Sequence, residues 1–503
     1  MSEQTSDGTS PGKFDSLELP SLRPGNLVRE FGPGMMLMMT GIGTSHLVTA
    51  PVAGGRYGYA LLWCLPIAYI FKYYGFEMAI RFTHATGRSM LDAYATAWKK
   101  IPVWYVLITT IIQSAVGQAG RLIAAAAVVF YFFRLYLDVD IPWVDDDKEL
   151  AVYAFLLGIM SVVIILQGRY AVVELATKIA AGILIVCTFA VFVVEPAPIA
   201  EFVHFFQLET PEGSWLIIAS FLGLLPTGID VSLQASEWGK AKKVGMGLLR
   251  NEMEAEGLAT RFDAFESRKE DLAVDVSKLP EHAQEYCRRW FKIGLLDFRA
   301  GHIISFILAT IFLVLAAVWL YPSDVSGNAV MGEIARIFTE SVGPSLMLVF
   351  LVGALAATYS TALNYFDGWP RVVGACCRNL FRKTAALPRK ASVDFDPRSR
   401  WTWYSEYNIY RISMFFSLIA SVAIIAGVPR PVYLVLVASA LAYFVAPVIF
   451  FLNLYYCRTV IPKDDKLFYP STFATWFSWI SLFVFTGMSA ILILQRLFGI
   501  SVF

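Results

Sequence analysis

The sequence predicts an all-α polytopic membrane protein. Of its 503 residues, 57% are hydrophobic and only 16% are charged, whereas about a quarter of the residues in an ordinary globular domain are charged. Several apolar stretches reach the roughly 20 residues that an α-helix needs to cross a bilayer. These stretches are too long and too continuous to be strands of a β-barrel. We therefore expect about eleven transmembrane helices.

The predicted spans follow one another along almost the whole chain. They lie near residues 31–52, 57–83, 103–134, 150–167, 171–194, 214–238, 298–321, 344–370, 408–428, 431–456 and 473–497. Residues 1–28 are polar and rich in Ser, Pro and Gly, which is typical of a disordered tail. Residues 29–238 then hold spans 1 to 6, and residues 298–503 hold spans 7 to 11. Between them, residues 239–297 form a charged insertion in which we expect one or two short surface helices.

The distribution of basic residues predicts the orientation. Lys and Arg gather before span 1, between spans 2 and 3, between spans 8 and 9, and after span 10. Because cytoplasmic loops carry the excess of basic residues, we expect the amino terminus and the insertion in the cytoplasm. An odd number of spans places the carboxyl terminus outside, and we expect a bacterial inner (plasma) membrane. The insertion could dock a partner or regulate the protein, or it could be a solvated connector.

Composition and motifs exclude several classes of function. The net charge of +1 gives no reason to expect a nucleic-acid partner. The six cysteines are scattered and form no CxxC pair, so we predict neither a disulfide framework nor a zinc site. We find no glycine-rich phosphate loop and no nucleophile elbow, and therefore expect neither an enzyme nor a cofactor.

Span 1 contains residues that are unfavourable in a membrane helix. It includes GIGTSHL at 41–47, in which Gly43 lowers helix stability by about 1 kcal/mol relative to Ala. Thr44, Ser45 and His46 add polar side chains at the same depth. Non-helical backbone within a membrane is tolerated only where protein buries it or where it lines a wet cavity. We therefore interpret this segment as a break that forms part of a binding site.

Span 6 contains a second break at a matching place. It includes LLPTGID at 224–230, where Pro226 removes a backbone donor and Asp230 puts a carboxylate inside the span. Breaks in the first and sixth spans fit an inverted repeat of five plus five helices, whose half-helix ends meet at the bilayer midplane and hold the substrate. The alternative is that the glycines are close-packing positions and the proline is a simple kink.

Several longer segments resemble a known family. They are GGRYGYALLW at 54–63, AIRFTHATGRSMLDAY at 79–94, GRYAVVELATK at 168–178 and GALAATYSTALNYFDGWPRVVGA at 353–375. In order and position they resemble the Nramp (natural resistance-associated macrophage protein) family of proton-coupled divalent-metal transporters, over residues 30–490. The resemblance implies the LeuT-like fold of the amino acid–polyamine–organocation superfamily, with helices 1 and 6 unwound and one added helix. It also implies secondary active transport by alternating access.

The sequence departs from this family at the residues that bind the metal. The first family break reads Asp-Pro-Gly-Asn, which residues 43–46 replace with Gly-Thr-Ser-His. The sixth reads Met-Pro-His-Asn, which residues 225–228 replace with Leu-Pro-Thr-Gly. Span 3 carries acidic residues on the proton path of the family, whereas residues 101–136 contain no Asp or Glu. The resemblance therefore implies the family fold with a remodelled central site.

The predicted site residues fall into two groups. The candidates for substrate binding are Gly43, Thr44, Ser45, His46, Leu225, Thr227, Gly228 and Asp230. The candidates for lining the cavity or coupling are Gln113, Gln118, Asn364 and Asp367. For Asp367, a salt bridge with Arg371 is the alternative that we favour. We predict no metal site, and His46 and Asp230 are the only candidate ligands if one exists.

Three functions remain open at this point. A divalent cation usually needs a carboxylate ligand, and none stands at the first break. We therefore expect a transporter of a small polar organic solute, for which Gly43 and Gly228 leave room. The second hypothesis is a manganese, iron or magnesium transporter that uses His46 and Asp230. The third is a non-transporting sensor or scaffold that signals through residues 239–297.

The expected partners are few. They are the lipid bilayer and a small solute or cation, and no motif points to a protein partner. Proton coupling, sodium coupling and uncoupled transport all stay open.

Overall fold

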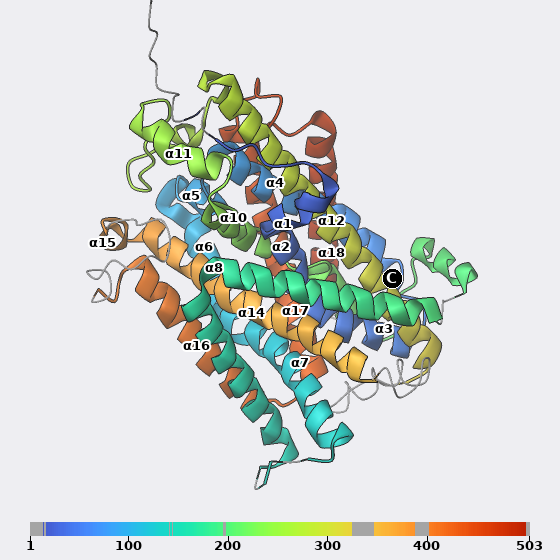
Figure 1. Cartoon of the computed structure of the whole chain (residues 1–503). Helices are drawn as coiled ribbons and strands as arrows, with labels where there is room; N and C mark the ends of the chain where they lie inside the picture. The colour runs from blue at the N-terminus through green and yellow to red at the C-terminus, as the bar shows by residue number, and fades with distance from the viewer. Residues whose placement is uncertain are drawn as a thin grey trace, which may run out of the picture.

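A computed structural model describes Phe14 and residues 17–139, 141–142, 144–194, 198–323, 347–387 and 402–498. Every regular element in these ranges is a helix, and Figure 1 shows the long helices packed side by side. In chain order the elements are α1 (Pro24–Glu30), α2 (Pro33–Gly41), η1 (Ile42–Thr49), α3 (Ala50–Tyr57), α4 (Cys64–Thr86), α5 (Met90–Tyr94), η2 (Trp98–Lys100), α6 (Ile101–Ile112), η3 (Gln113–Gly117), α7 (Gln118–Phe130), η4 (Tyr131–Tyr136), α8 (Asp146–Val194), η5 (Ile199–Phe206), α9 (Trp215–Leu224), α10 (Val231–Lys242), α11 (Met246–Ala255), η6 (Lys269–Leu272), η7 (Val276–Lys278), α12 (Glu281–Trp319), α14 (Met347–Leu380), α15 (Arg382–Ala385), α16 (Glu406–Gly427), α17 (Pro431–Val460) and α18 (Thr472–Phe498). The predicted all-α fold class is confirmed.

The helices correspond to the predicted spans. Within the described residues, seven helical stretches are long and apolar enough to cross a membrane, and they match spans 3, 4, 5, 7, 9, 10 and 11. The other four predicted spans correspond to α2–η1–α3, α4, α9–α10 and α14. These four carry polar or irregular segments, and they are the helices that meet around the predicted site. Spans 4 and 5 form one continuous helix, α8, which Figure 1 shows bent into two legs.

Span 1 corrects the expectation of an unwound helix 1. Residues 42–49 form a π-helix, η1, and the flanking residues Gly41 and Ala50 keep right-handed helical dihedral angles. The π-helix has a wider turn with i→i+5 hydrogen bonds, and such turns recur at functional sites. The hydroxyl of Ser45 donates to the carbonyl of Gly41 at 2.6 Å. Polar side chains therefore support the irregular turn without opening the helix.

Span 6 is broken as predicted. Helix α9 ends at Leu224, Leu225 has extended dihedral angles, and α10 starts at Val231. The last carbonyls of a helix have no partner within the helix. Those at the end of α9 therefore need donors from elsewhere in the protein.

The insertion packs against the membrane helices. It contains α11, η6 and η7, and α12 begins inside it at Glu281 and continues through span 7. Leu249, Met253 and Trp290 belong to a buried apolar cluster beneath it. Of the predicted disordered tail, residues 1–13, 15 and 16 lie outside the described residues. Residues 24–28 correct that prediction, because they form α1, which starts with Pro24 at a position that favours proline.

Candidate functional site

The break in span 6 holds the ammonium group of a buried lysine. Lys72 of α4 donates to the carbonyl oxygens of Gly223 at 2.7 Å, Leu225 at 2.8 Å and Thr227 at 3.1 Å. A charged ammonium has three N–H donors, and these three contacts use all of them. The carbonyl end of a helix also carries a partial negative charge. The end of α9 is therefore occupied by an amino group of the protein itself, which in its charged form is a built-in cation.

Spans 1 and 6 meet at this break. Gly41 lies so close to the carbonyl of Pro226 that a β-carbon at Gly41 would collide with it. Thr227 Oγ1 lies 3.1 Å from Thr40 Oγ1 and 3.1 Å from the hydroxyl of Tyr365. Thr227, a predicted site residue, thus links α2, the break and α14 through hydroxyl groups.

A carboxylate, a guanidinium and two aromatic rings lie next to the break. Asp230 precedes the first residue of α10, and its Oδ1 is buried without a partner among the described residues. The charges of Arg121 and Lys72 interact with this carboxylate. Arg121 of α7 lies over the rings of Tyr365 and Trp369, with its Cζ at 3.8 Å and 4.9 Å from their centroids. Such stacking orients the guanidinium while leaving its N–H groups available.

Several buried polar atoms around this cluster have no partner in the described part of the chain. They are Thr44 Oγ1, both amide atoms of Gln113, Gln118 Oε1, Arg121 Nε, Asp230 Oδ1, both amide atoms of Gln234, Asn364 Nδ2 and Trp369 Nε1. More than 90% of buried polar groups in proteins are paired, so each exception calls for an explanation. Gln113 Oε1, Arg121 Nη1 and Trp369 all lie within 3 Å of the point where Gly117 would carry a β-carbon. These three groups therefore converge at the irregular start of α7.

The structure separates His46 from this cluster. Its Nδ1 lies 2.8 Å from Ser45 Oγ, and its Nε2 lies 2.9 Å from both Tyr69 OH and Ser305 Oγ. The ring is fully buried and points toward α4 and α12. Both ring nitrogens have hydrogen-bond partners, so His46 orients η1 against its neighbours. Ser45 takes part in the same arrangement.

The two glycines that we expected to leave room for a substrate do not. At Gly43, a β-carbon would collide with the backbone of α14 at Ala357 and Thr358, and the amide of Gly43 donates to Thr361 Oγ1 at 2.9 Å. At Gly228, the space is filled by the carboxylate of Asp230. Gly43 is therefore a close-packing position, as the alternative interpretation held.

The remaining candidates lie on α7 and α14. The amide of Gln118 donates to the carbonyl of Ala362 at 3.1 Å, and Asn364 Oδ1 accepts from Thr177 Oγ1 at 2.7 Å. Asp367 forms the predicted salt bridge, with its Oδ2 at 2.6 Å from Arg371 Nε. The same carboxylate accepts from Trp238 at 2.8 Å and Tyr410 at 2.6 Å, so it ties α10 and α16 to α14.

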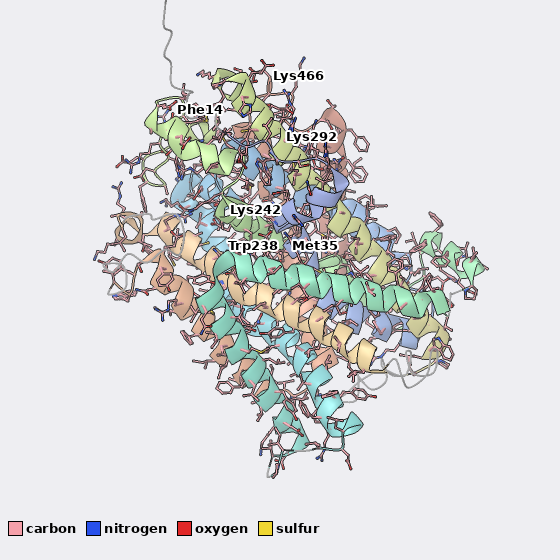
Figure 2. The ribbon with its side chains drawn as sticks, viewed as in Figure 1. Phe14, Met35, Trp238, Lys242, Lys292 and Lys466 are labelled. Atoms are coloured by element: carbon pink, nitrogen blue, oxygen red, sulfur yellow. The ribbon has the colours of Figure 1, made fainter. Side chains whose placement is uncertain are left out.

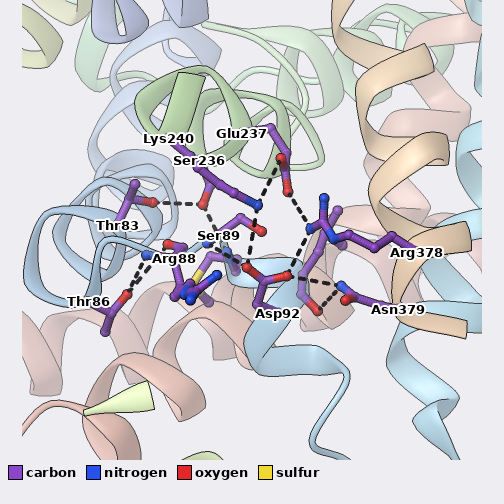
Figure 3. A network of polar contacts seen from close by, with 12 residues as sticks. Thr83, Thr86, Arg88, Ser89, Asp92, Ser236, Glu237, Lys240, Arg378 and Asn379 are labelled. Atoms are coloured by element: carbon purple, nitrogen blue, oxygen red, sulfur yellow. Dashed lines mark hydrogen bonds and ion pairs between the residues drawn. The ribbon is translucent and has the colours of Figure 1, made fainter. Parts of the chain in front are cut away.

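A network of ion pairs surrounds the last turns of α10 (Figure 3). Asp92 of α5 is its buried centre and accepts from Arg378 Nη2 at 2.9 Å and Asn379 Nδ2 at 3.3 Å. Its other oxygen lies 3.5 Å from Lys240 Nζ of α10. Arg378 also pairs with Glu406 of α16. The network joins four separate helices on one side of the break.

The sequence contained a signal for Lys72 that our prediction did not use. Lys72 lies in the middle of predicted span 2, and an ionisable residue inside a membrane span is a functional candidate by default. The predicted site residues do not include it. Tyr69, Ser305, Tyr365 and Trp369 gave no comparable signal, because their partners lie on helices far away in the sequence.

The side chains beside the break include few that could coordinate a metal ion. The described residues contain no group of three or more His, Cys, Asp or Glu side chains placed to hold a metal ion. Among the described residues that contact the break, Asp230 supplies an acidic side chain, and the cationic side chains of Arg121 and Lys72 already interact with it.

Comparison with known proteins places these features in context. A sequence model described as "Natural resistance-associated macrophage protein-like" (Nramp) matches residues 34–495. The uncharacterized protein PM0681 of Pasteurella multocida is 21% identical over 376 residues, which cover 72% of this chain and 73% of that protein. A variant of a manganese transporter from Eremococcus coleocola has a similar structure, with a TM-score of 0.59 and 11% identity over 96% of this chain and 91% of that chain.

A second solved structure is also similar. Mhp1, a nucleobase-cation-symport-1 family transporter with bromovinylhydantoin bound, gives a TM-score of 0.52 and 13% identity over 93% of this chain and 87% of that chain. At these identities the likeness concerns the fold.

Proposed function

The chain belongs to the Nramp family of membrane transporters, and on that premise we propose that its central site carries a small polar organic solute by alternating access. The bare divalent metal ion that the family carries would not be its substrate. The observation that carries the proposal is the ammonium of Lys72 on the carbonyls of the span 6 break. In this fold, unwound carbonyls and half-helix ends are the groups that coordinate ions.

The charge of Lys72 opposes a second cation at the break. Two unit charges of like sign about 4 Å apart repel by about 4 kcal/mol at an effective dielectric constant of about 20. For a divalent ion the repulsion is about twice as large. Asp230 could offset part of it, but Arg121 and Lys72 already act on that carboxylate. The balance of charge therefore favours a substrate that is not a bare cation.

The unpaired polar groups support an organic substrate. Gln113 and Gln234 each offer a free amide, Arg121 a free N–H, and Asp230 a free carboxylate oxygen among the described residues. A solute with both donors and acceptors could satisfy these groups together, and a buried donor or acceptor left without a partner costs about 1–3 kcal/mol. The rings of Tyr365 and Trp369 add an apolar wall beside Arg121.

The ion-pair network would take part in the transport cycle. Asp92, Lys240 and Arg378 hold α10, the half-helix that follows the break, against α5 and α14 (Figure 3). Alternating access requires one group of helices to rock against the other around the site. We propose that this network closes its end of the pathway and that it separates when that end opens. We place that end, with the insertion and the amino terminus, in the cytoplasm of a bacterial inner membrane, as the basic residues indicate.

Flux into proteoliposomes tests the proposal. The purified protein is assayed with amino acids, organic acids and small amides, and in parallel with manganese and magnesium, under imposed proton and sodium gradients. We expect saturable uptake of an organic solute that is lost in Asp230→Asn and Gln113→Leu. Lys148→Gln, which alters an exposed ion pair with Asp145 at the start of α8, serves as the control and should transport normally.

Two outcomes would overturn the proposal. Saturable manganese uptake that disappears in Asp230→Asn would establish the metal hypothesis. Absence of flux for every solute, together with a protein partner bound to residues 239–297, would favour the sensor or scaffold.

A further inference from the structure

A groove opens between the end of α17 and the start of α18. It encloses about 620 Å³, which is within the range of small-ligand sites. Its walls are formed by Arg458, Lys463, Tyr469, Pro470, Thr472, Thr475, Trp476 and Trp479. The lining contains two basic side chains, three hydroxyl groups and two tryptophans, and no Asp or Glu.

The two basic groups of the groove have no acidic partner among the described residues. No described residue forms an ion pair with Arg458 or Lys463, and the Nε of Arg458 is buried without a hydrogen-bond partner. A buried guanidinium N–H without an acceptor is unfavourable, so the geometry calls for an acceptor from outside the chain. The nearby carboxylate of Asp465 instead accepts from the amides of Leu467 and Phe468 in its own loop.

The groove lies where lipid headgroups would be. Trp476 and Trp479 line it and are 66% and 41% exposed, and Phe473 and Phe483 on the same helix are also exposed. Tryptophan is enriched where a membrane meets water, and exposed phenylalanines on a transmembrane helix face lipid. Figure 2 shows Lys466, in the loop between α17 and α18, at the same end of the molecule as Lys292, where α12 leaves the insertion.

We propose that this groove binds the phosphate-bearing headgroup of an anionic phospholipid, in the leaflet on the side of the insertion. Arg458 donates to a phosphate oxygen, Lys463 contributes a second positive charge, and the hydroxyls of Thr472 and Thr475 donate to the remaining oxygens. Basic pockets between membrane helices recognise anionic headgroups in this way. The acyl chains then run along the exposed apolar face of α18.

The headgroup would hold α17 and α18 together at this end. Helix α17 also packs against the broken span through Ser220 Oγ, which lies 3.3 Å from the carbonyl of Leu436. An anionic lipid is therefore placed to stabilise a helix that supports the transport site. This inference does not depend on which solute is carried.

The test measures lipid retention by the full-length protein. The protein is placed in nanodiscs of phosphatidylcholine alone or with phosphatidylglycerol, and retained lipid is counted by native mass spectrometry. We expect retention of one phosphatidylglycerol and a higher melting temperature than in phosphatidylcholine alone. Each basic residue near a membrane surface contributes about fivefold in affinity, so Arg458→Gln with Lys463→Gln should weaken retention by about twentyfold.

Matched controls make each outcome decisive. Lys463 is exposed, so Lys463→Gln alone should fold normally and weaken retention by about fivefold. Lys466→Gln removes a neighbouring charge that does not line the groove and should weaken retention less than Lys463→Gln does. An equal loss in Lys466→Gln would overturn the proposal in favour of a general surface charge. It would also be overturned by equal retention in all variants, or by millimolar inorganic phosphate stabilising the protein as well as the lipid does.

Discussion

Replacing Lys72 with methionine removes the ammonium and keeps a side chain of similar length. Lys72 is fully buried, so the change acts on the three carbonyls at the span 6 break and on the neighbouring carboxylate of Asp230. Methionine fills irregular space well, and packing should be little affected. The variant therefore isolates the role of the fixed charge.

The expected loss follows from the contacts. Each hydrogen bond from a charged donor contributes about 1.5–3 kcal/mol, and three of them are lost together. The variant also escapes the cost of burying an ammonium, which is several kcal/mol. We expect a net loss of about 3 kcal/mol, in line with the removal of one partner from a buried ionic site. For a chain of 503 residues, about 1 °C per kcal/mol gives a melting temperature lowered by roughly 3 °C.

Thermal unfolding in detergent tests this expectation, with Lys178→Met as the matched control. Lys178 pairs with Glu174 at 2.8 Å but is partly exposed, so its loss should change the melting temperature by less than about 1 °C. Sodium or manganese should recover part of the stability of Lys72→Met, because a free cation can then bind to the carbonyl oxygens that Lys72 contacts in the wild type. The same ions should not stabilise the wild type in this way. Equal melting temperatures for the two variants, or no recovery by cations, would refute the role of Lys72 as a built-in cation.

Three further predictions concern packing and charge elsewhere. Gly43→Ala should lower stability by about 1–3 kcal/mol, because the added methyl group would overpack against α14. Gly182 has open space around it, so Gly182→Ala should be neutral or raise stability by up to about 1 kcal/mol. Equal melting temperatures for the two variants would show that Gly43 faces free space. Asp92→Asn should cost about 3 kcal/mol because it removes a fully buried counter-charge of Arg378 and leaves the partly exposed Glu406. Arg378→Met in the same chain should recover part of that loss, and additive effects would argue against the pair. Partial burial raises the pKa of Glu254, but hydrogen bonds and charge from two arginines outweigh it and lower the pKa below its ordinary value of 4.5. The contribution of Glu254 to the free energy of unfolding is therefore present above about pH 4.5 and is lost as the pH falls through the lowered pKa. The melting temperature of Glu254→Gln should depend less on pH in that range than the melting temperature of the wild type.

The fold was predictable because its signals are carried by long segments. Apolar runs of membrane length located spans such as α16 and α17, and Pro226 with Asp230 located the break in span 6. The break in span 1 was predicted from equally good local signals, but the chain keeps a helix there. Tertiary contacts decide the difference, because η1 is wedged against α14 at Gly43 and held by hydrogen bonds at His46. A single sequence does not reveal which helix lies opposite a glycine.

The site was predictable only in part, for the same reason. Thr227 and Asp230 were identified from the break itself, since their positions are local. The arrangement around His46 depends on Tyr69 and Ser305, which are 23 and 259 residues away in the sequence. A lone histidine in a span gives no indication of such partners. Its role as a hydrogen-bonded packing residue emerges only when three helices are placed together.

The charges beside the break also restrict what the solute can be. In their ordinary charge states the buried side chains of Lys72 and Arg121 are cationic and Asp230 is anionic, so the three together carry one net positive charge beside the break. An uncompensated charge away from water is strongly unfavourable, and an anionic group on the substrate would balance it. A carboxylate would accept from the free Nε of Arg121 and would meet the positive amino end of α10. Organic acids and amino acids should therefore compete for uptake while their uncharged amides do not, and competition by the amides alone would contradict an anionic substrate group.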